Sequence, residues 1–169
     1  MKTFWIINLI LFQLSWFSAA FFTQYAALII SALILLHFYL SPTPKLDIKV
    51  SLLALMGIFI DTLHLNLGTF SSEHAFFPFW LALLWMIFCI SLNHSLSWCA
   101  KQPYWLLVLF GSIGGSLSYW AGIQAGALST LQTPSHTLVV LALSWAILFP
   151  SLVQAHHYLT TRDVLGIQR

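Results

Sequence analysis

Residues 50–69, VSLLALMGIFIDTLHLNLGT, decide the fold class of this chain. The stretch is mostly apolar, and it has about the 20 residues that a helix needs to cross a hydrocarbon core of about 30 Å. It lacks the alternation of period two that a barrel strand shows, and it is far longer than such a strand. A chain in lipid must satisfy its backbone hydrogen bonds internally, so the stretch is predicted to be a transmembrane helix.

The rest of the chain repeats this pattern. Of its 169 residues, 60% are hydrophobic and 6% are charged, whereas a soluble domain has about a quarter of its residues charged. The basic residues are scattered, so no nucleic-acid partner is predicted. We predict one integral membrane domain, residues 1–169, that is all-α and polytopic. Its six transmembrane helices are expected at about 4–22, 24–41, 50–69, 76–96, 104–127 and 137–158.

Basic residues orient these helices. In a six-helix topology with both termini together, every Lys and Arg falls on one side: Lys2, Lys45, Lys49, Lys101, Arg162 and Arg169. The positive-inside rule makes this side cytoplasmic, which predicts an N-in/C-in arrangement. The first segment begins like a signal peptide, but its apolar stretch is longer than the usual 7–15 residues, so it is predicted to be retained as a helix.

Asp61 is a carboxylate within an apolar segment. At 1.5 Å per residue it lies about 18 Å beyond Lys49, just past the membrane midplane. His64 is its i,i+3 neighbour on the same helical face. An ionised carboxylate at this depth costs about 2.5–3.5 kcal/mol, so it should face the bundle interior. Depth places further members of a predicted pocket in the same half: Gln13, Trp80, Trp85, Tyr119 and Gln124.

Two interpretations of Asp61 follow. It forms an acid/base or proton-relay pair with His64, which titrates near neutrality. Alternatively, Asp61 accepts hydrogen bonds from Gln13, a Trp indole or a hydroxyl and locks helix packing. His64 could equally lie in the interface region.

Two groups of histidines could act as ligands of a metal ion or of haem. His64, Glu73, His74 and His136 offer zinc-type ligands near one membrane surface, but the chain has no HxxxH or HExxH pair. His37, Asn93, His94, His156 and His157 gather near the cytoplasmic surface, where polar side chains suit the headgroup layer. The sequence therefore predicts neither a bound metal nor another cofactor.

A face of small residues marks the fifth segment. Gly111, Gly115, Gly122 and Gly126 recur on one helical face together with Ser118. Small residues allow close approach of helix backbones in lipid. This face is predicted to pack against another helix, either within the bundle or in a homo-oligomer or membrane partner, and a substrate groove along it is the alternative.

Four stretches carry a family resemblance: NLILFQLSWF at 8–17, GIFIDTLH at 57–64, FPFWLALLWMIF at 77–88 and GSLSYWAGIQAGAL at 115–128. In these the chain resembles a family of small bacterial inner-membrane proteins catalogued as a domain of unknown function. The resemblance implies an inner-membrane location and a link to lipid modification, because members are often encoded near cyclopropane-fatty-acid-synthase-like methyltransferases. It marks Asn8, Gln13, Trp16, Asp61, Trp80, Trp85, Tyr119 and Gly122.

Three functions remain open at this point. The chain is an enzyme or accessory acting on membrane lipid, with Asp61 and His64 as acid and base. It is a non-catalytic scaffold or partner subunit that uses the glycine face. It is a small transporter with Asp61 as the binding carboxylate, although no inverted repeat is visible.

Overall fold

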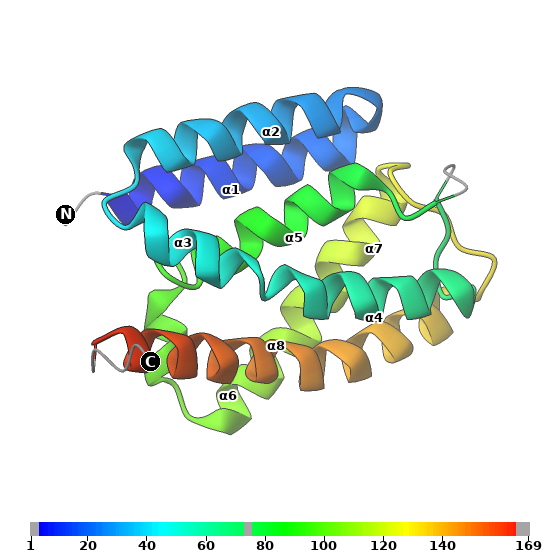
Figure 1. Ribbon diagram of the computed structural model, residues 1–169. Helices are drawn as coiled ribbons and strands as arrows, with labels where there is room; N and C mark the ends of the chain where they lie inside the picture. Colours follow the sequence, from blue (N-terminus) through cyan, green and yellow to red (C-terminus); the bar gives the residue numbers. More distant parts are fainter. Residues whose placement is uncertain (1–3, 73–75, 165–169) are drawn as a thin grey trace.

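A helical hairpin opens the structure (Figure 1). The computed structural model describes residues 4–72 and 76–164, with side chains as far as Thr161. Within these residues, helices α1 (Phe4–Phe21) and α2 (Thr23–Leu40) are separated by a single residue. Large apolar side chains remain exposed on the hairpin, with Leu28 at 75% and Leu35 at 70% of their maximal accessible surface. Such an apolar outer face suits contact with lipid.

The third predicted helix begins earlier than expected. Helices α3 (Pro44–Ser51) and α4 (Ala54–Asn66) form one apolar run of 23 residues. The predicted start at residue 50 was wrong because Pro44 occupies the first turn, where its missing N–H costs nothing. At the junction, the N–H groups of Leu53 and Met56 donate to carbonyls three residues back, which tightens the helix locally.

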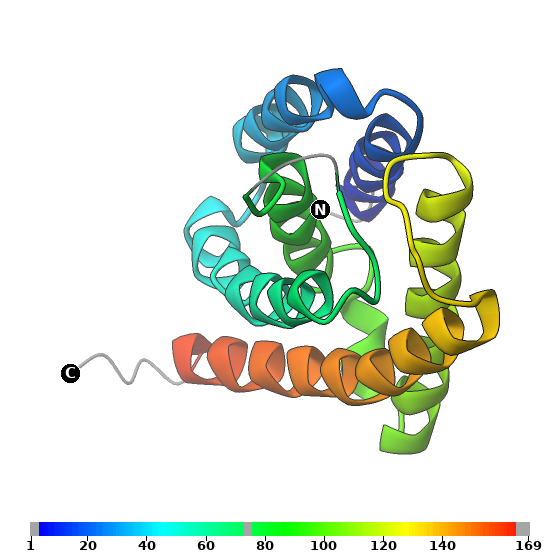
Figure 2. The same cartoon turned by 90° about the vertical axis from the view of Figure 1, so that its right-hand side faces the viewer.

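Helix α5 (Phe79–Ser91) lies at the centre of the bundle (Figures 1 and 2). It contacts α1, α2, α3 and α4, and no residue from Trp80 to Ser91 is exposed. The predicted helix 76–96 was too long, because the chain leaves α5 in a turn and then forms a 3₁₀ helix, η1 (Ser97–Lys101). A helix that is apolar all round and short is typical of a position enclosed by protein.

The remaining helices form the other side of the bundle. Helix α6 (Tyr104–Phe110) continues through a π-helical turn, η2 (Gly111–Gly115), into α7 (Ser116–Gln124). The long helix α8 (Pro134–Val164) packs along all three of these elements. The described start of α1 and the described end of α8 lie at the same end of the bundle (Figure 1).

Length and composition make this an all-α membrane bundle, as the sequence predicted. Five helical runs in the described residues are long and apolar enough to cross a membrane, and α5 is the shorter sixth. Several charged residues lie outside the described part of the chain: Lys2, Glu73, Arg169 and the side chain of Arg162. The orientation of the helices therefore stays a prediction.

Candidate functional site

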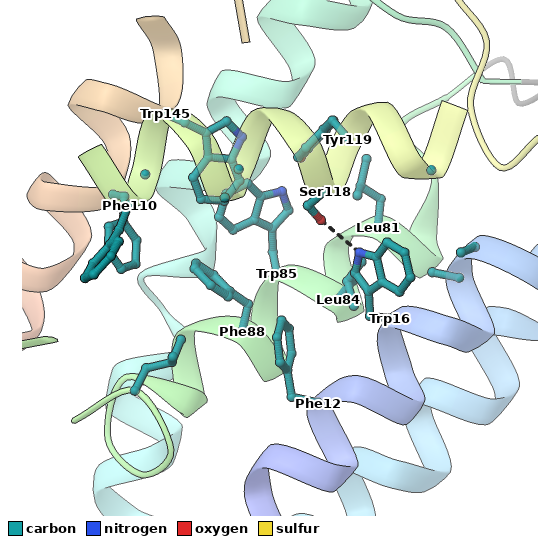
Figure 3. Close-up of a pocket in the computed structure, with 18 of the residues that line it drawn as sticks. Phe12, Trp16, Leu81, Leu84, Trp85, Phe88, Phe110, Ser118, Tyr119 and Trp145 are labelled. Atoms are coloured by element: carbon teal, nitrogen blue, oxygen red, sulfur yellow. Dashed lines mark hydrogen bonds between the residues drawn. The ribbon is translucent and has the colours of Figure 1, made fainter. Parts of the chain in front are cut away.

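An apolar cavity of about 380 Å³ lies between α1, α5, the α6–α7 run and α8 (Figure 3). We call it the aromatic cavity. Its size falls within the range of about 300–1,000 Å³ that is usual for small-molecule sites. Its lining is dominated by aromatic side chains: Phe12, Trp16, Trp80, Trp85, Phe88, Trp98, Phe110, Tyr119, Trp145 and Phe149.

Two stacked indoles form one wall. The rings of Trp85 and Trp145 lie 5.2 Å apart between centroids and are nearly parallel, at 14°. A methyl group added at Gly57 would collide with Trp85, and one added at Gly115 would collide with Trp145. Gly57 of α4 therefore makes room for the ring of Trp85, and Gly115 of η2 makes room for the ring of Trp145. The indole pair packs between these two elements.

Asp61 lies behind this wall and forms a hydrogen bond with Trp85. Its side chain is 2% exposed and does not line the cavity. Its Oδ2 atom accepts hydrogen bonds from Trp85 Nε1 at 2.6 Å and from the Tyr119 hydroxyl at 2.5 Å. A buried carboxylate that accepts such bonds fixes the rings that donate them. Asp61 thus links α4 to α5 and α7 and positions two cavity residues.

A polar bridge crosses the cavity between α1 and α7. Trp16 Nε1 donates to Ser118 Oγ at 2.8 Å (Figure 3). Trp80 also lines the cavity, and its buried indole N–H has no hydrogen-bond partner among the described residues. The site therefore has few polar groups, placed in a lining that is otherwise hydrocarbon and aromatic carbon.

The cavity opens toward the surface of the bundle on the side of α6. Three of its lining residues, Trp98, Phe110 and Gly114, are exposed, whereas Trp85 and Tyr119 are buried. The π-helical turn η2 lies beside this opening and contributes Gly114 and Gly115 to the wall. Single π-helical turns inside α-helices are frequently found at functional sites.

Among the described residues that line the aromatic cavity, Cys99 is the one that carries a thiol. It lies in η1, and burial raises its pKa to about 11. The thiol is therefore protonated near neutrality and is a poor nucleophile. It contributes apolar surface to the cavity.

The residues predicted from sequence divide between the cavity and other places. Trp16, Trp80, Trp85 and Tyr119 line it, whereas Gln13 and Gln124 are exposed and do not. Asn8 lies away from the cavity and accepts hydrogen bonds from the backbone and hydroxyl of Ser95.

His64 is not bonded to Asp61. Its Nδ1 lies 3.2 Å from the hydroxyl of Thr69, and its ring contacts Phe70. The predicted acid/base pair therefore has its two members hydrogen-bonded to different partners. Of the alternative zinc ligands, Glu73 and His74 lie outside the described residues, and His136 is exposed.

The glycine face is shorter than the sequence predicted. Gly111 and Gly115 pack against α8, where an added methyl group would collide with Trp145 or Phe149. An added methyl group at Gly122 would meet nothing, because Gly122 borders the aromatic cavity. Gly126 has a φ of 86° and ends the helical run, which is the usual place of a glycine in that conformation.

A second buried carboxylate escaped the sequence analysis. Asp47 is 0% exposed and lies in α3, which starts near the beginning of α1 (Figure 1). Its Oδ1 accepts from Asn93 Nδ2 at 2.7 Å and lies 2.9 Å from His94 Nε2. Its Oδ2 lies 3.1 Å from His37 Nε2 and accepts a hydrogen bond from the hydroxyl of Ser41. We call these five residues the Asp47 cluster.

A family model described as "Protein of unknown function (DUF2878)" matches residues 5–151. The chain belongs to the DUF2878 family. The match spans the helices from α1 through most of α8, so it includes both buried carboxylates and the whole lining of the aromatic cavity. The resemblance noted in the sequence, to a membrane family of unknown function, is thereby confirmed.

No curated protein and no solved structure matches this DUF2878 protein.

Proposed function

We propose that this DUF2878 protein binds the hydrocarbon chain of a membrane lipid in the aromatic cavity and serves in lipid modification at the bacterial inner membrane. The observation that carries the proposal is the cavity's composition: its lining is almost entirely apolar and aromatic. A water-filled path for a polar solute would need several polar groups along its wall, and an apolar cavity does not hold water well. An acyl or isoprenoid chain is the ligand that matches such a wall.

The opening supports a membrane origin for the ligand. Trp98, Phe110 and Gly114 expose the cavity on the outer face of a bundle that is itself apolar. A chain entering from the bilayer would stay in hydrocarbon throughout. A second feature is the hydrogen bond from Trp16 to Ser118. It joins α1 to α7 beside the cavity, where these two helices make few other contacts.

Asp61 acts in this proposal as a positioning residue. It holds Trp85 and Tyr119 in the wall and does not itself face the ligand. Trp16 and Ser118 supply a polar bridge within the cavity lining, and they are bonded to each other. A homo-oligomer or membrane partner formed through α7 remains a separate prediction.

Photolabelling tests the proposal. The purified full-length protein would be placed in vesicles that contain phosphatidylethanolamine with a diazirine in one acyl chain, and labelled residues would be mapped by mass spectrometry. We expect label on α1, α5 and α7 residues that line the cavity. Label confined to outer residues such as Leu28 and Leu35 would contradict the proposal.

A cavity-filling variant sharpens the test. Gly122→Leu places a side chain where an added methyl group meets nothing, so the variant should fold and occupy the cavity. Labelling of the lining residues should fall several-fold. Ile113→Phe is the matched control, because Ile113 is exposed on the same helical run and does not line the cavity. Equal labelling of both variants would show that the chain lies elsewhere.

A further inference from the structure

The Asp47 cluster brings nitrogen and oxygen ligands together from three separate segments. His37 comes from α2, Asp47 from α3, and His94 from the turn after α5. One ligand atom from each lies within 4.8 Å of the others. The cluster lies outside the aromatic cavity, and the proposed lipid binding does not use it.

We propose that His37, Asp47 and His94 bind one divalent transition-metal ion of the zinc type. Two imidazoles and one carboxylate form a donor set that zinc accepts, with bonds of about 2.0–2.2 Å. Ligand atoms around a tetrahedral ion at that distance lie roughly 3.3 Å from one another. The nitrogens of His37 and His94 lie 3.1 Å and 2.9 Å from two different oxygens of Asp47, and the three ligand atoms lie within 4.8 Å of one another, so an ion would draw them closer together.

Charge favours a cation at this place. His37 and Asp47 are fully buried, and the His94 side chain is 8% exposed. Within the described residues, the ionic partners of Asp47 are these two histidines. A negatively charged carboxylate is costly to bury in an apolar bundle unless positive charge lies beside it. A divalent ion held by all three would compensate this charge directly.

The surroundings hold the ligands in place. Asn93 Nδ2 donates both to the carboxylate of Asp47 and to the hydroxyl of Thr43. The ring of Phe4 contacts both imidazoles, with centroid distances of 5.4 Å to His37 and 4.8 Å to His94. Asn93 thus orients the Asp47 carboxylate as outer groups of metal sites orient their ligands. The second ring nitrogen of His37 is buried and has no hydrogen-bond partner among the described residues.

The ion would fasten one end of the bundle. It would connect α2, α3 and the turn after α5, with Phe4 of α1 packed over the ligands. Three protein ligands leave a fourth position for water or another small ligand.

Metal titration of the full-length protein tests the site. The protein would be purified in detergent with a tag that contains no histidine, stripped with a chelator, and titrated with Zn²⁺ alone or with Co²⁺ alone. We expect one equivalent of either ion per chain, visible absorption bands of tetrahedral Co²⁺, and a higher melting temperature with Zn²⁺. Absence of stoichiometric binding to the folded protein would overturn the proposal.

Variants then locate the ion. His94→Ala should remove stoichiometric binding and the Co²⁺ bands, and Asn93→Ala should weaken binding by about 10- to 100-fold. His157→Ala is the control, because His157 is exposed on α8 and should change neither. Asp47→Asn should also remove binding; if that variant fails to fold, His94→Ala and the wild-type titration decide. Binding that survives His94→Ala unchanged would show that the ion lies at another site.

Discussion

Two aspartates on the same helical run, Asp47 and Asp61, are both buried but are stabilised in different ways. Fourteen residues separate them, a rise of about 21 Å along a helix. Asp61 accepts from an indole and a phenol, both on one carboxylate oxygen. Asp47 uses both of its oxygens, toward two imidazoles, an amide and a hydroxyl.

The different hydrogen-bond partners of Asp61 and Asp47 indicate different roles for the two buried carboxylates. The partners of Asp61 are large rings whose other faces line a cavity, so the carboxylate shapes a binding surface without touching it. The partners of Asp47 meet both of its oxygens, and one ligand atom each of His37, Asp47 and His94 lies within 4.8 Å of the others, as the proposed ion site requires. Burial alone would not have distinguished them, because the donor types and the number of oxygens in use carry the distinction.

Replacement of Asp47 gives the largest expected effect. In Asp47→Asn, the negative charge is lost and one side-chain oxygen becomes an NH₂ group, which can no longer accept a hydrogen bond from Ser41 or from Asn93. Breaking a buried charged network of this kind costs about 3–5 kcal/mol. Thermal unfolding in detergent, followed by circular dichroism, should show a clear fall in melting temperature relative to wild type. An unchanged melting temperature would mean that the cluster contributes little to stability.

The comparison also shows what the sequence could reveal. Six apolar segments, their approximate positions and the cost of a carboxylate in lipid were readable from composition and length. Asp47 was missed because SPTPKLD reads as a loop, whereas Pro44 starts a helix and makes residue 47 part of a buried face. The same argument from desolvation would have applied to Asp47 once it was placed inside the helix.

The aromatic wall was only partly predictable. Trp85 and Tyr119 could be placed at the depth of Asp61 from residue counting. Trp145 and Gly57 could not be recognised, because their importance arises from contacts between helices far apart in the chain. Side-chain periodicity shows which face of a helix is apolar, but it does not show which helix that face meets.

A larger side chain should be tolerated at Gly122 but should destabilise the protein at Gly115. Gly115→Leu would drive a side chain into the indole of Trp145, and overpacking of this kind typically costs about 1–3 kcal/mol. Gly122→Leu should leave stability nearly unchanged, since the space beside it is open. Melting temperatures of the two variants, measured side by side, check the difference. Equal losses would mean that both glycines pack against protein.

Removal of the Asp61 side chain should have an intermediate effect. In Asp61→Ala, the indole N–H of Trp85 and the hydroxyl of Tyr119 lose their acceptor while still buried. An unsatisfied buried group costs about 1–3 kcal/mol. We also expect weaker photolabelling of the cavity, because both rings become free to move. The single variant Tyr119→Phe serves as a control: it removes one donor and leaves the other bond intact.

Asp61→Asn should have the smallest effect and gives the sharpest contrast with Asp47→Asn. Both present donors bind one oxygen of Asp61, and the amide oxygen of Asn can accept from both. The charge is removed as well, so no desolvation cost remains and the change in stability should stay below about 1 kcal/mol. Melting temperature and photolabelling of the cavity should both match wild type.

The contrary outcome for Asp61→Asn is equally informative. If the variant is as stable as wild type yet loses cavity labelling, the negative charge itself is needed, and Asp61 would do more than position rings. His64→Gln then separates the two explanations. His64 bonds to Thr69 and not to Asp61, so the positioning role predicts normal labelling in this variant. A matching loss in both variants would instead revive the acid/base pair that the i,i+3 spacing first suggested.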